Sequence, residues 1–317
     1  FCMSVYTTLT LQEVQDFAAP YGLNVIDLIP IQGGIQNTNY FLTCQEGQQC
    51  VLTLFEELDH QAAGELVPVL VHLAQHGVAV PVPLHVNGEA ILTLKDKPAQ
   101  IAPRLQGQHP QPANLAQVIE IATAQAKMHV ALQQFPLQRS NVRDHQYWMQ
   151  VGRELQPNLN AADQTLLSEL FGLFDKLTTA YPNRPRGLIH ADLFRDNTLF
   201  AGDQLVGILD FYEMNHDDLL FDIAITLNDF CTDEDFGLNP EKMAAFLTAY
   251  AAIRPLTDDE RACLEIYLAM AAGRFWLMRL RVAAKNTQLG LNSDDILHKN
   301  PNEMRYMLMN RLKFVTA

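Results

Sequence analysis

The sequence predicts an α+β protein with two lobes, in which a small antiparallel sheet with one helix precedes a larger, mainly helical lobe. Short apolar segments separated by polar turns dominate the first hundred residues, which is typical of strands. Apolar residues at three- and four-residue steps dominate from Leu115 onward, which indicates helices. The change falls across Gln100–Gly107, whose proline and glycine suit a connector between lobes. We therefore predict an N-terminal lobe over residues 3–101 and a C-terminal lobe over residues 102–317.

The first elements expected are a hairpin and a helix. In Tyr40–Phe55 two apolar segments flank the polar turn Gln45–Gln49, which predicts two paired strands. Apolar residues recur at helical spacing through Gln61–His76, and Gly77 then offers a left-handed cap, so one helix is expected there. Asn87 and Gly88 follow a proline-rich extended segment and predict the turn of a second hairpin.

Four segments of the C-terminal lobe show helical periodicity. They are Leu115–Leu132, Asp163–Tyr181, Pro240–Arg254 and Thr257–Asn286. Asp163 is the expected N-cap of the second segment, because an aspartate side chain can accept a hydrogen bond from the first turn. The 317 residues, 48% of them hydrophobic, are enough to bury a core in each lobe.

Charge and cysteine content exclude several classes of partner. The net charge of -14 would repel nucleic acid and anionic lipid, so neither is an expected partner. The most apolar stretch, Tyr267–Met278, is interrupted by Arg274 and is too short to span a bilayer. The five cysteines form no metal-binding spacing, and Cys44 and Cys50, which flank the first hairpin turn, are expected to be reduced. We predict a cytoplasmic protein that binds a small molecule, with its oligomeric state left open.

The most informative stretch is Gly187–Phe211, where short apolar segments enclose polar residues. It predicts a hairpin that brings Asp192, Asn197 and Asp210 together at strand ends. Phosphoryl transfer from ATP needs a carboxylate beside the acceptor hydroxyl and oxygen ligands for magnesium. The order His-x-Asp, Asn five residues later, and a further Asp matches the catalytic loop and metal site of kinase-like folds. We therefore predict Asp192 as the catalytic base, Asn197 and Asp210 as magnesium ligands, and His190 as a structural support of the loop.

The alternative is a polar turn with ordinary caps. That interpretation does not account for the hairpin, the second aspartate and the order of sheet before helices. A phosphotransferase that uses ATP and magnesium is therefore the favoured class.

With these residues in view, the chain resembles the aminoglycoside phosphotransferase and choline kinase superfamily over nearly its whole length. The resemblance implies a protein-kinase-like fold and an ATP-covering loop over Gly33–Tyr40. Glu65 matches the helix glutamate that holds a lysine or arginine in this superfamily, although a solvent-facing glutamate would look the same. Adenine is expected against the connector backbone. The cofactor-binding residues implied are Gly33, Gly34, Asn37, Thr38, Asn39, Thr53, Glu65, Ile101, Ala102 and Arg104.

Thr53 stands where many members of the superfamily carry a strand lysine or arginine that contacts phosphate. A threonine offers no charge, so Lys95, Arg104, backbone amides or magnesium would have to compensate. The chain also resembles the bacterial homoserine kinases of this superfamily, in Gly-Gly-Ile-x-Asn-Thr-Asn-Tyr-Phe, Val-Leu-Thr-Leu-Phe-Glu and His-Ala-Asp-Leu-Phe-Arg-Asp-Asn. In that subgroup threonine is usual in the strand, so Thr53 is expected to be a mark of the subgroup.

A homoserine acceptor is a zwitterion, whose carboxylate requires a cation and whose ammonium requires a carboxylate. The expected substrate residues are Arg274, Trp276 and Arg279 on one helix, and Asp217 after the metal-binding aspartate. Arginines on the exposed face of an amphipathic helix would give the same pattern. Asp222 is expected to support the catalytic loop, as its counterpart does in the superfamily.

The resemblance implies ATP- and magnesium-dependent phosphorylation of L-homoserine to O-phospho-L-homoserine, on the route to threonine. Two alternatives remain at this point. One is an aminoglycoside, choline or ethanolamine kinase of the same superfamily, and the other is a nucleotide-binding regulator without turnover.

Overall fold

The computed structural model describes residues 7–31, 37–140, 142–288 and 300–316. They form two compact units. One holds the described residues of Phe1–Gln106 together with Leu137–Ser140, and the other holds those of Gly107–Pro136, Asn141–Gln288 and Lys299–Ala317. The predicted α+β class is confirmed, with an antiparallel sheet in the first unit and mainly helices in the second. The units divide after Gln106, whereas the predicted boundary after Ile101 falls inside a strand.

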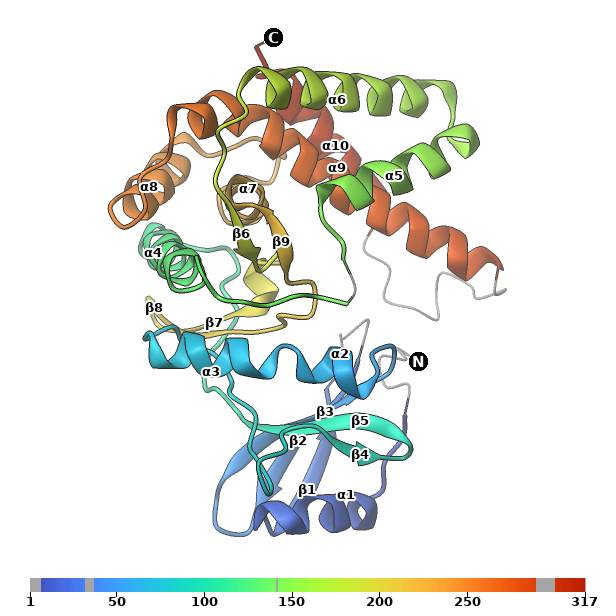
Figure 1. The fold of residues 1–317 in the computed structure, drawn as a ribbon, viewed down its shortest axis with the longest axis vertical. Coiled ribbons are helices and arrows are strands. Elements are labelled where there is room, and N and C mark those ends of the chain that lie inside the picture. The colour runs from blue at the N-terminus through green and yellow to red at the C-terminus, as the bar shows by residue number, and fades with distance from the viewer. Residues whose placement is uncertain (1–6, 32–36, 141, 289–299, 317) are drawn as a thin grey trace. The chain divides into compact units, whose positions relative to one another are not determined.

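The sheet of the first unit has five antiparallel strands in the order β1-β2-β3-β5-β4 (Figure 1). Their bounds are β1 Val25–Pro30, β2 Asn37–Cys44, β3 Gln49–Phe55, β4 Leu92–Leu94 and β5 Lys97–Pro103. The predicted first hairpin is confirmed, with Leu42 opposite Cys50 across the β2–β3 pair. Tyr40, Leu42, Leu52 and Leu54 are buried in the core beneath it. Cys44 and Cys50 are buried free thiols.

Three helices accompany this sheet, α1 Leu11–Ala18, α2 His60–Gly64 and α3 Val67–Gln75. A short 3-10 turn, Ala19–Tyr21, follows α1. The prediction of one helix over Gln61–His76 was wrong, because the helix breaks at Glu65 and Leu66 and restarts with Pro68 in its first turn. Proline has no N–H to continue a helix but suits a first turn. Gly77 ends the segment with a φ of 74°, as expected of a left-handed cap.

The second hairpin of this unit lies one turn later than predicted. Asn87 and Gly88 form a turn that is closed only by the bridge between Val86 and Glu89. The partner of β4 is β5, and Lys95 and Asp96 connect the two strands with φ values of 50° and 60°. Two successive positive φ angles match the twist of a tight hairpin, but without glycine the sequence did not indicate this turn.

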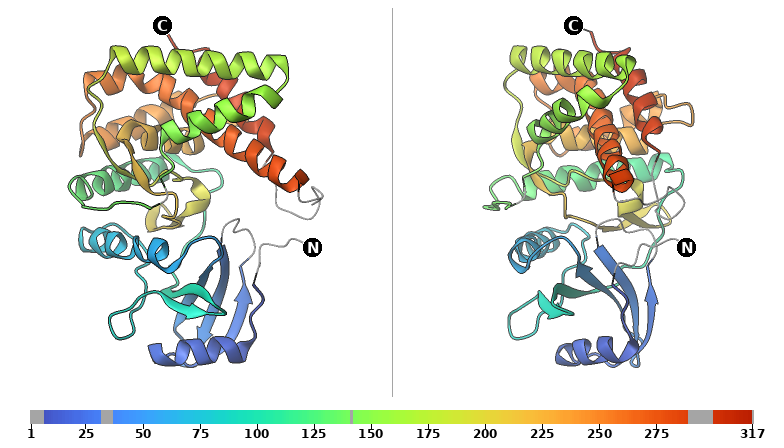
Figure 2. Two further views of the ribbon diagram at one scale, coloured as in Figure 1. Left: turned by 45° about the vertical axis from the view of Figure 1, so that its right-hand side comes forward. Right: turned by 90° about the vertical axis from the view of Figure 1, so that its right-hand side faces the viewer.

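Seven helices are described in the second unit (Figure 2). They are α4 Leu115–Ala131, α5 His145–Leu155, α6 Ala161–Ala180, α7 Leu219–Phe230, α8 Pro240–Ala251, α9 Asp258–Gln288 and α10 Pro301–Leu312. The helix α9 packs against α5, α6, α7 and α10. The predicted cap of α6 was wrong, since Asn160 caps the helix and Asp163 donates its N–H to that side chain at 2.9 Å. Among the described residues, no helix is long and apolar enough to cross a membrane.

Two short strand pairs of the second unit enclose the predicted catalytic stretch. β6 (Arg186–Ile189) pairs with β9 (Asn215–Asp218), and β7 (Thr198–Ala201) pairs with β8 (Gln204–Ile208). The β7–β8 pair is the hairpin predicted from the sequence. Two loops therefore share one region, the loop from β6 to β7, which ends in the 3-10 turn Arg195–Asn197, and the loop from β8 to β9.

Candidate active site

Asp192 and Asn197 lie on the loop from β6 to β7 and are hydrogen bonded to each other. The Asn197 side-chain amide donates to the backbone oxygen of Asp192 at 2.8 Å and to its carboxylate at 3.0 Å. Both NH₂ hydrogens are used in this way, so the amide oxygen of Asn197 points away from Asp192. The backbone oxygen of Asn197 accepts from Leu209 at 2.8 Å, which ties the second loop to the first just before Asp210.

Asp192, Asp210 and Glu213 concentrate negative charge where the two loops meet. Burial raises the pKa of Asp192, and the negative charge of Asp210 raises it further. The side chain of Asp210 is accessible, yet surrounding protein atoms and the charge of Glu213 raise its pKa as well. These carboxylates are costly to ionise when no cation is bound, and they lie beside an amide oxygen. Carboxylate and amide oxygens are the ligands that a hard divalent cation prefers. Asn197 and Asp210 thus fit a magnesium ion.

The backbone of the catalytic loop is held by Asp222, which is fully buried on α7. One carboxylate oxygen accepts from Ala191 N at 2.8 Å, and the other accepts from His190 N at 3.2 Å. Burial raises the pKa of Asp222, but hydrogen bonding and charge from His129 lower it overall. The carboxylate is therefore kept ionised under a loop whose Ala191 has a left-handed φ of 67°.

The side chain of His190 links the loop from β6 to β7 with the loop from β8 to β9. Its Nε2 lies 2.8 Å from the backbone oxygen of Leu209, and its Nδ1 accepts from Asp192 N at 3.2 Å. Burial lowers the pKa of His190, which favours the neutral ring that these two bonds require. A neutral histidine with both nitrogens engaged is suited to support the loop, as the sequence predicted for this residue.

Sequence reasoning missed two residues of this support, His129 and Tyr250. His129 Nε2 lies 2.8 Å from the Asp222 carboxylate, and its Nδ1 lies 2.6 Å from the Tyr250 hydroxyl. All three side chains are buried. Asp222 lies 93 residues and Tyr250 lies 121 residues after His129 in the sequence. No local sequence pattern therefore indicated these hydrogen bonds.

Three residues predicted for the acceptor, Arg274, Trp276 and Arg279, are buried in the structure. Arg274 is fully buried, donates to the Ala191 backbone oxygen and lies 3.5 Å from Glu213, so it supports the catalytic loop from beneath. Trp276 is 1% exposed within the helical core. Arg279 donates to the Asn300 backbone oxygen at 2.7 Å and to Glu303 at 2.9 Å, and thereby holds the start of α10. Direct contact of these side chains with an acceptor is therefore not part of this arrangement.

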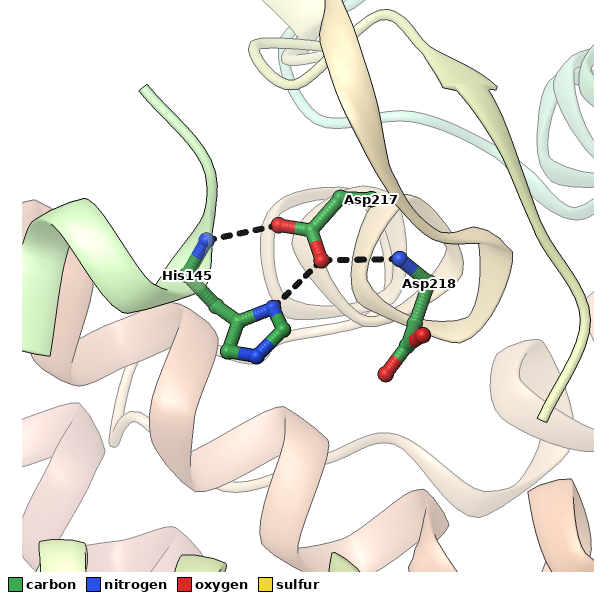
Figure 3. A group of neighbouring side chains, drawn as sticks. All are labelled: His145, Asp217 and Asp218. Carbon is green, nitrogen blue, oxygen red and sulfur yellow. Dashed lines mark hydrogen bonds and ion pairs between the residues drawn. The ribbon is translucent and has the colours of Figure 1, made fainter. Parts of the chain in front are cut away.

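The fourth predicted acceptor residue, Asp217, is also fully buried. Its carboxylate accepts from the backbone and ring nitrogens of His145 and, at 2.8 Å, from Asp218 N (Figure 3). Asp218 in turn pairs with Arg184 at 3.2 Å and accepts from the Tyr267 hydroxyl. Although His145, Asp217 and Asp218 are close enough to share a metal ion, these bonds already occupy them, so the cluster attaches α5 to β9.

The pairing of His145 with Asp217 should make stability depend on pH. Burial alone would lower the pKa of His145, but the Asp217 carboxylate outweighs burial and raises it overall. The stabilisation is therefore complete below the ordinary histidine pKa of about 6.5 and is lost as pH rises through the raised pKa. We expect the melting temperature difference between wild type and His145→Gln to shrink from pH 6 to pH 9 in thermal scans. His216→Gln, at an exposed position of β9, is the matched control, and a constant difference for His145→Gln would contradict the expectation.

On the first unit, the predicted cofactor residues of β2 and β3 form a polar group. Thr53 Oγ1 donates to the Asn39 side-chain oxygen at 2.8 Å, and Thr38 Oγ1 donates to Glu56 at 2.5 Å. Asn37 is 6% exposed at the start of β2. Gly33 and Gly34 lie outside the described residues.

The two cations that the sequence offered in place of a strand lysine at Thr53 are engaged elsewhere. Lys95 pairs with Glu13 at 3.0 Å, and Arg104 stacks on the ring of Phe41 at 3.8 Å. Lys97, which the sequence did not single out, pairs with Glu56 directly after β3. The first unit therefore has a cation near the end of β3 that comes from β5.

Glu65 lies at the end of α2, with its carboxylate 3.6 Å from the Arg139 guanidinium. It also accepts from Ser140 N at 3.2 Å. Ile101 and Ala102 are buried in β5, and the backbone oxygen of Ile101 accepts from Leu84 N at 2.8 Å. These bonds lie within the first unit.

The described fold, and the two loops that carry Asp192 and Asn197 on one and Asp210 on the other, are those of a kinase-like phosphotransferase. Comparison with family models agrees, since residues 27–256 match the phosphotransferase enzyme family. The chain belongs to this family.

Within the family, the chain is similar to homoserine kinases. It is 40% identical over 283 residues to the homoserine kinase of Methylobacillus flagellatus, covering 88% of this chain and 87% of that protein. It is 36% identical over 311 residues to the homoserine kinase of Pseudomonas aeruginosa, covering 98% and 96%.

Solved structures with the same fold include amicoumacin kinase in complex with AMP-PNP, Ca2+ and its ligand, and a microcompartment-associated aminopropanol kinase. Both have a TM-score of 0.70, with 18% and 16% sequence identity. The match to the amicoumacin kinase covers 97% of this chain and 93% of the kinase chain. The match to the aminopropanol kinase covers 96% of this chain and 94% of that kinase chain. The protein-kinase-like fold expected from the sequence is confirmed.

Proposed function

We propose that this protein transfers the terminal phosphate of ATP to the hydroxyl of L-homoserine and forms O-phospho-L-homoserine. The observation that carries the proposal is the hydrogen-bonded pair of Asp192 and Asn197 beside Asp210, in a chain that is 40% identical to a homoserine kinase. The reaction would take place on the route to threonine. Free buried thiols at Cys44, Cys50 and two further positions accord with a reducing compartment such as the cytoplasm.

In the proposed mechanism Asp192 positions the homoserine hydroxyl and accepts its proton. Its raised pKa makes the carboxylate a better proton acceptor than an ordinary aspartate. Asn197 donates to that carboxylate and so fixes its orientation. Asn197 and Asp210 would hold magnesium, which neutralises charge on the transferring phosphate when bound. His190 and Asp222 hold the loop in place during the reaction.

The nucleotide would be held by the first unit, through the segment that contains Gly33 and Gly34 and the residues that follow it in β2. Backbone amides of such a segment can donate to phosphate oxygens. Asn39 and Thr53 would then supply neutral hydrogen bonds, with Glu65 and the backbone of Ile101–Arg104 as further contacts. Because Thr53 carries no charge, we infer that phosphate charge is balanced mainly by magnesium and by backbone amides.

A panel of acceptors tests the proposed function. Purified protein is given ATP and magnesium with homoserine, choline, ethanolamine or an aminoglycoside, and ADP release is measured for each. We expect homoserine to give ADP well above the level without acceptor and above the other alcohols. If choline, ethanolamine or an aminoglycoside is preferred, the homoserine assignment is wrong while the phosphotransferase class stands. ATP binding without turnover on any acceptor would instead support a nucleotide-binding regulator.

A further inference from the structure

The acceptor proposed above has two charged groups that the predicted substrate residues do not reach. In homoserine only two methylene groups separate the reacting hydroxyl from the carbon that bears the carboxylate and ammonium. An acceptor placed at Asp192 must therefore put its carboxylate close to the catalytic loops. A carboxylate removed from water needs a charged hydrogen-bond donor there, because an unpaired buried charge is strongly unfavourable.

Among the described residues, three arginines of the second unit lie on the catalytic loops or contact these loops or Glu213, and Arg143 uses the fewest of its guanidinium donors. Arg274 is fully buried beneath Ala191. Arg195 directs its Nε and Nη2 at Asp229. The side chain of Arg143 is 25% exposed and makes one side-chain bond among the described residues, from Nη1 to Glu213 at 2.8 Å. A guanidinium has five N–H donors, so most of those on Arg143 can serve a ligand.

Arg143 is held at a defined position by β9. The Asn215 side-chain oxygen accepts from Arg143 N at 3.0 Å, and its nitrogen donates to the Glu213 backbone oxygen at 2.7 Å. A single buried side chain thus fixes the backbone of both members of the ion pair. Two residues later, His145 N donates to Asp217 at 2.7 Å, so the segment is attached twice.

Glu213 places this ion pair beside the catalytic carboxylates. It lies three residues after Asp210, its second oxygen is 3.5 Å from Arg274, and its charge acts on both Asp192 and Asp210. The pair therefore offers the partly exposed guanidinium of Arg143 with the buried negative charge of Glu213 beside it, and a guanidinium is suited to bind a carboxylate.

From this geometry, and resting on the proposed function, we propose that Arg143 binds the α-carboxylate of the acceptor and determines its specificity. Glu213 and Asn215 are positioning residues that orient the Arg143 guanidinium, and the negative charge of the buried Glu213 favours an acceptor that also carries an ammonium group. The site therefore selects an amino acid with a side-chain hydroxyl over an amino alcohol of the same length.

The test compares homoserine with aminopropanol, which corresponds to homoserine without its carboxylate, in wild type and Arg143→Met. Charge-assisted hydrogen bonds to a carboxylate predict a loss of about 10–150-fold in kcat/KM for homoserine, carried mainly by KM. For aminopropanol, kcat/KM should be unchanged, because the group that Arg143 binds is absent. Arg143→Lys, which keeps the charge but loses the planar fork, should lie between wild type and Arg143→Met.

Arg153→Met is the matched control, since it removes an exposed arginine from α5, the helix that follows Arg143. It should leave both acceptors within about twofold of wild type. Equal losses for homoserine and aminopropanol in Arg143→Met would show a general structural role and overturn the proposal. If the wild type uses neither acceptor, both the proposed function and the Arg143 proposal are wrong. If the wild type uses homoserine and aminopropanol equally well, only the Arg143 proposal is wrong.

Discussion

Asp192→Asn should lower kcat for the favoured acceptor by about 10²–10⁴-fold, which is the usual contribution of a positioned proton acceptor. Asparagine has nearly the same shape and keeps an oxygen for the Asn197 amide, which now donates to the carboxylate at 3.0 Å. Binding of ATP should therefore persist. The measurements are steady-state kinetics with ADP detection and titration of the protein with ATP.

The same change should leave the melting temperature equal to that of wild type or higher. Burial and the charge of Asp210 raise the pKa of Asp192, so the ionised carboxylate destabilises the fold at neutral pH, and a neutral amide removes that repulsion. Asp196→Asn, in the exposed part of the same loop, is the matched control and should change kcat by less than about threefold. A lower melting temperature for Asp192→Asn would contradict the expected charge repulsion, and an unchanged kcat would contradict the assignment of Asp192 as the proton acceptor.

The local structure around the proposed catalytic and metal-binding residues could be predicted from the sequence, because these residues lie within one short stretch of the chain. Asp192, Asn197 and Asp210 have fixed spacing, and the β7–β8 hairpin between them is a local structure. The first hairpin was predictable for the same reason, since its turn and both strands are continuous in the chain. The spacing of residues in the sequence is sufficient to predict a structural feature when residues close together in the chain form it.

The proposed acceptor residue Arg143 could not be predicted in this way, because its position depends on contacts between distant segments. Arg274 and Arg279 have the right charge for a carboxylate, yet folding places one beneath the catalytic loop and uses the other to hold α10. Arg143 precedes α5 without a recognisable motif, and Glu213, its partner, is 70 residues further along the chain. Charge on a helix shows that an arginine is present, whereas only the fold determines which arginine stays accessible.

The largest loss of stability is expected from Asp222→Asn. The Asp222 carboxylate accepts from Ala191 N, His190 N and the His129 ring, all in a buried environment. Asparagine retains one acceptor oxygen and turns an NH₂ group toward remaining donors. Removing the buried charge of Asp222 from its hydrogen-bond donors in this way costs about 3–5 kcal/mol, a large part of the stability of an ordinary protein.

Because Ala191 keeps its left-handed φ only while its N–H and oxygen are held, Asp222→Asn should also displace Asp192 and lower kcat. Kinetics measured well below the melting temperature separate this effect from unfolding, and urea unfolding gives the stability change itself. Asp175→Asn, at an exposed position of α6, is the control and should stay within about 0.5 kcal/mol of wild type. If Asp222→Asn lost stability but kept full kcat in its folded state, Asp222 would support the core of the second unit without positioning Asp192.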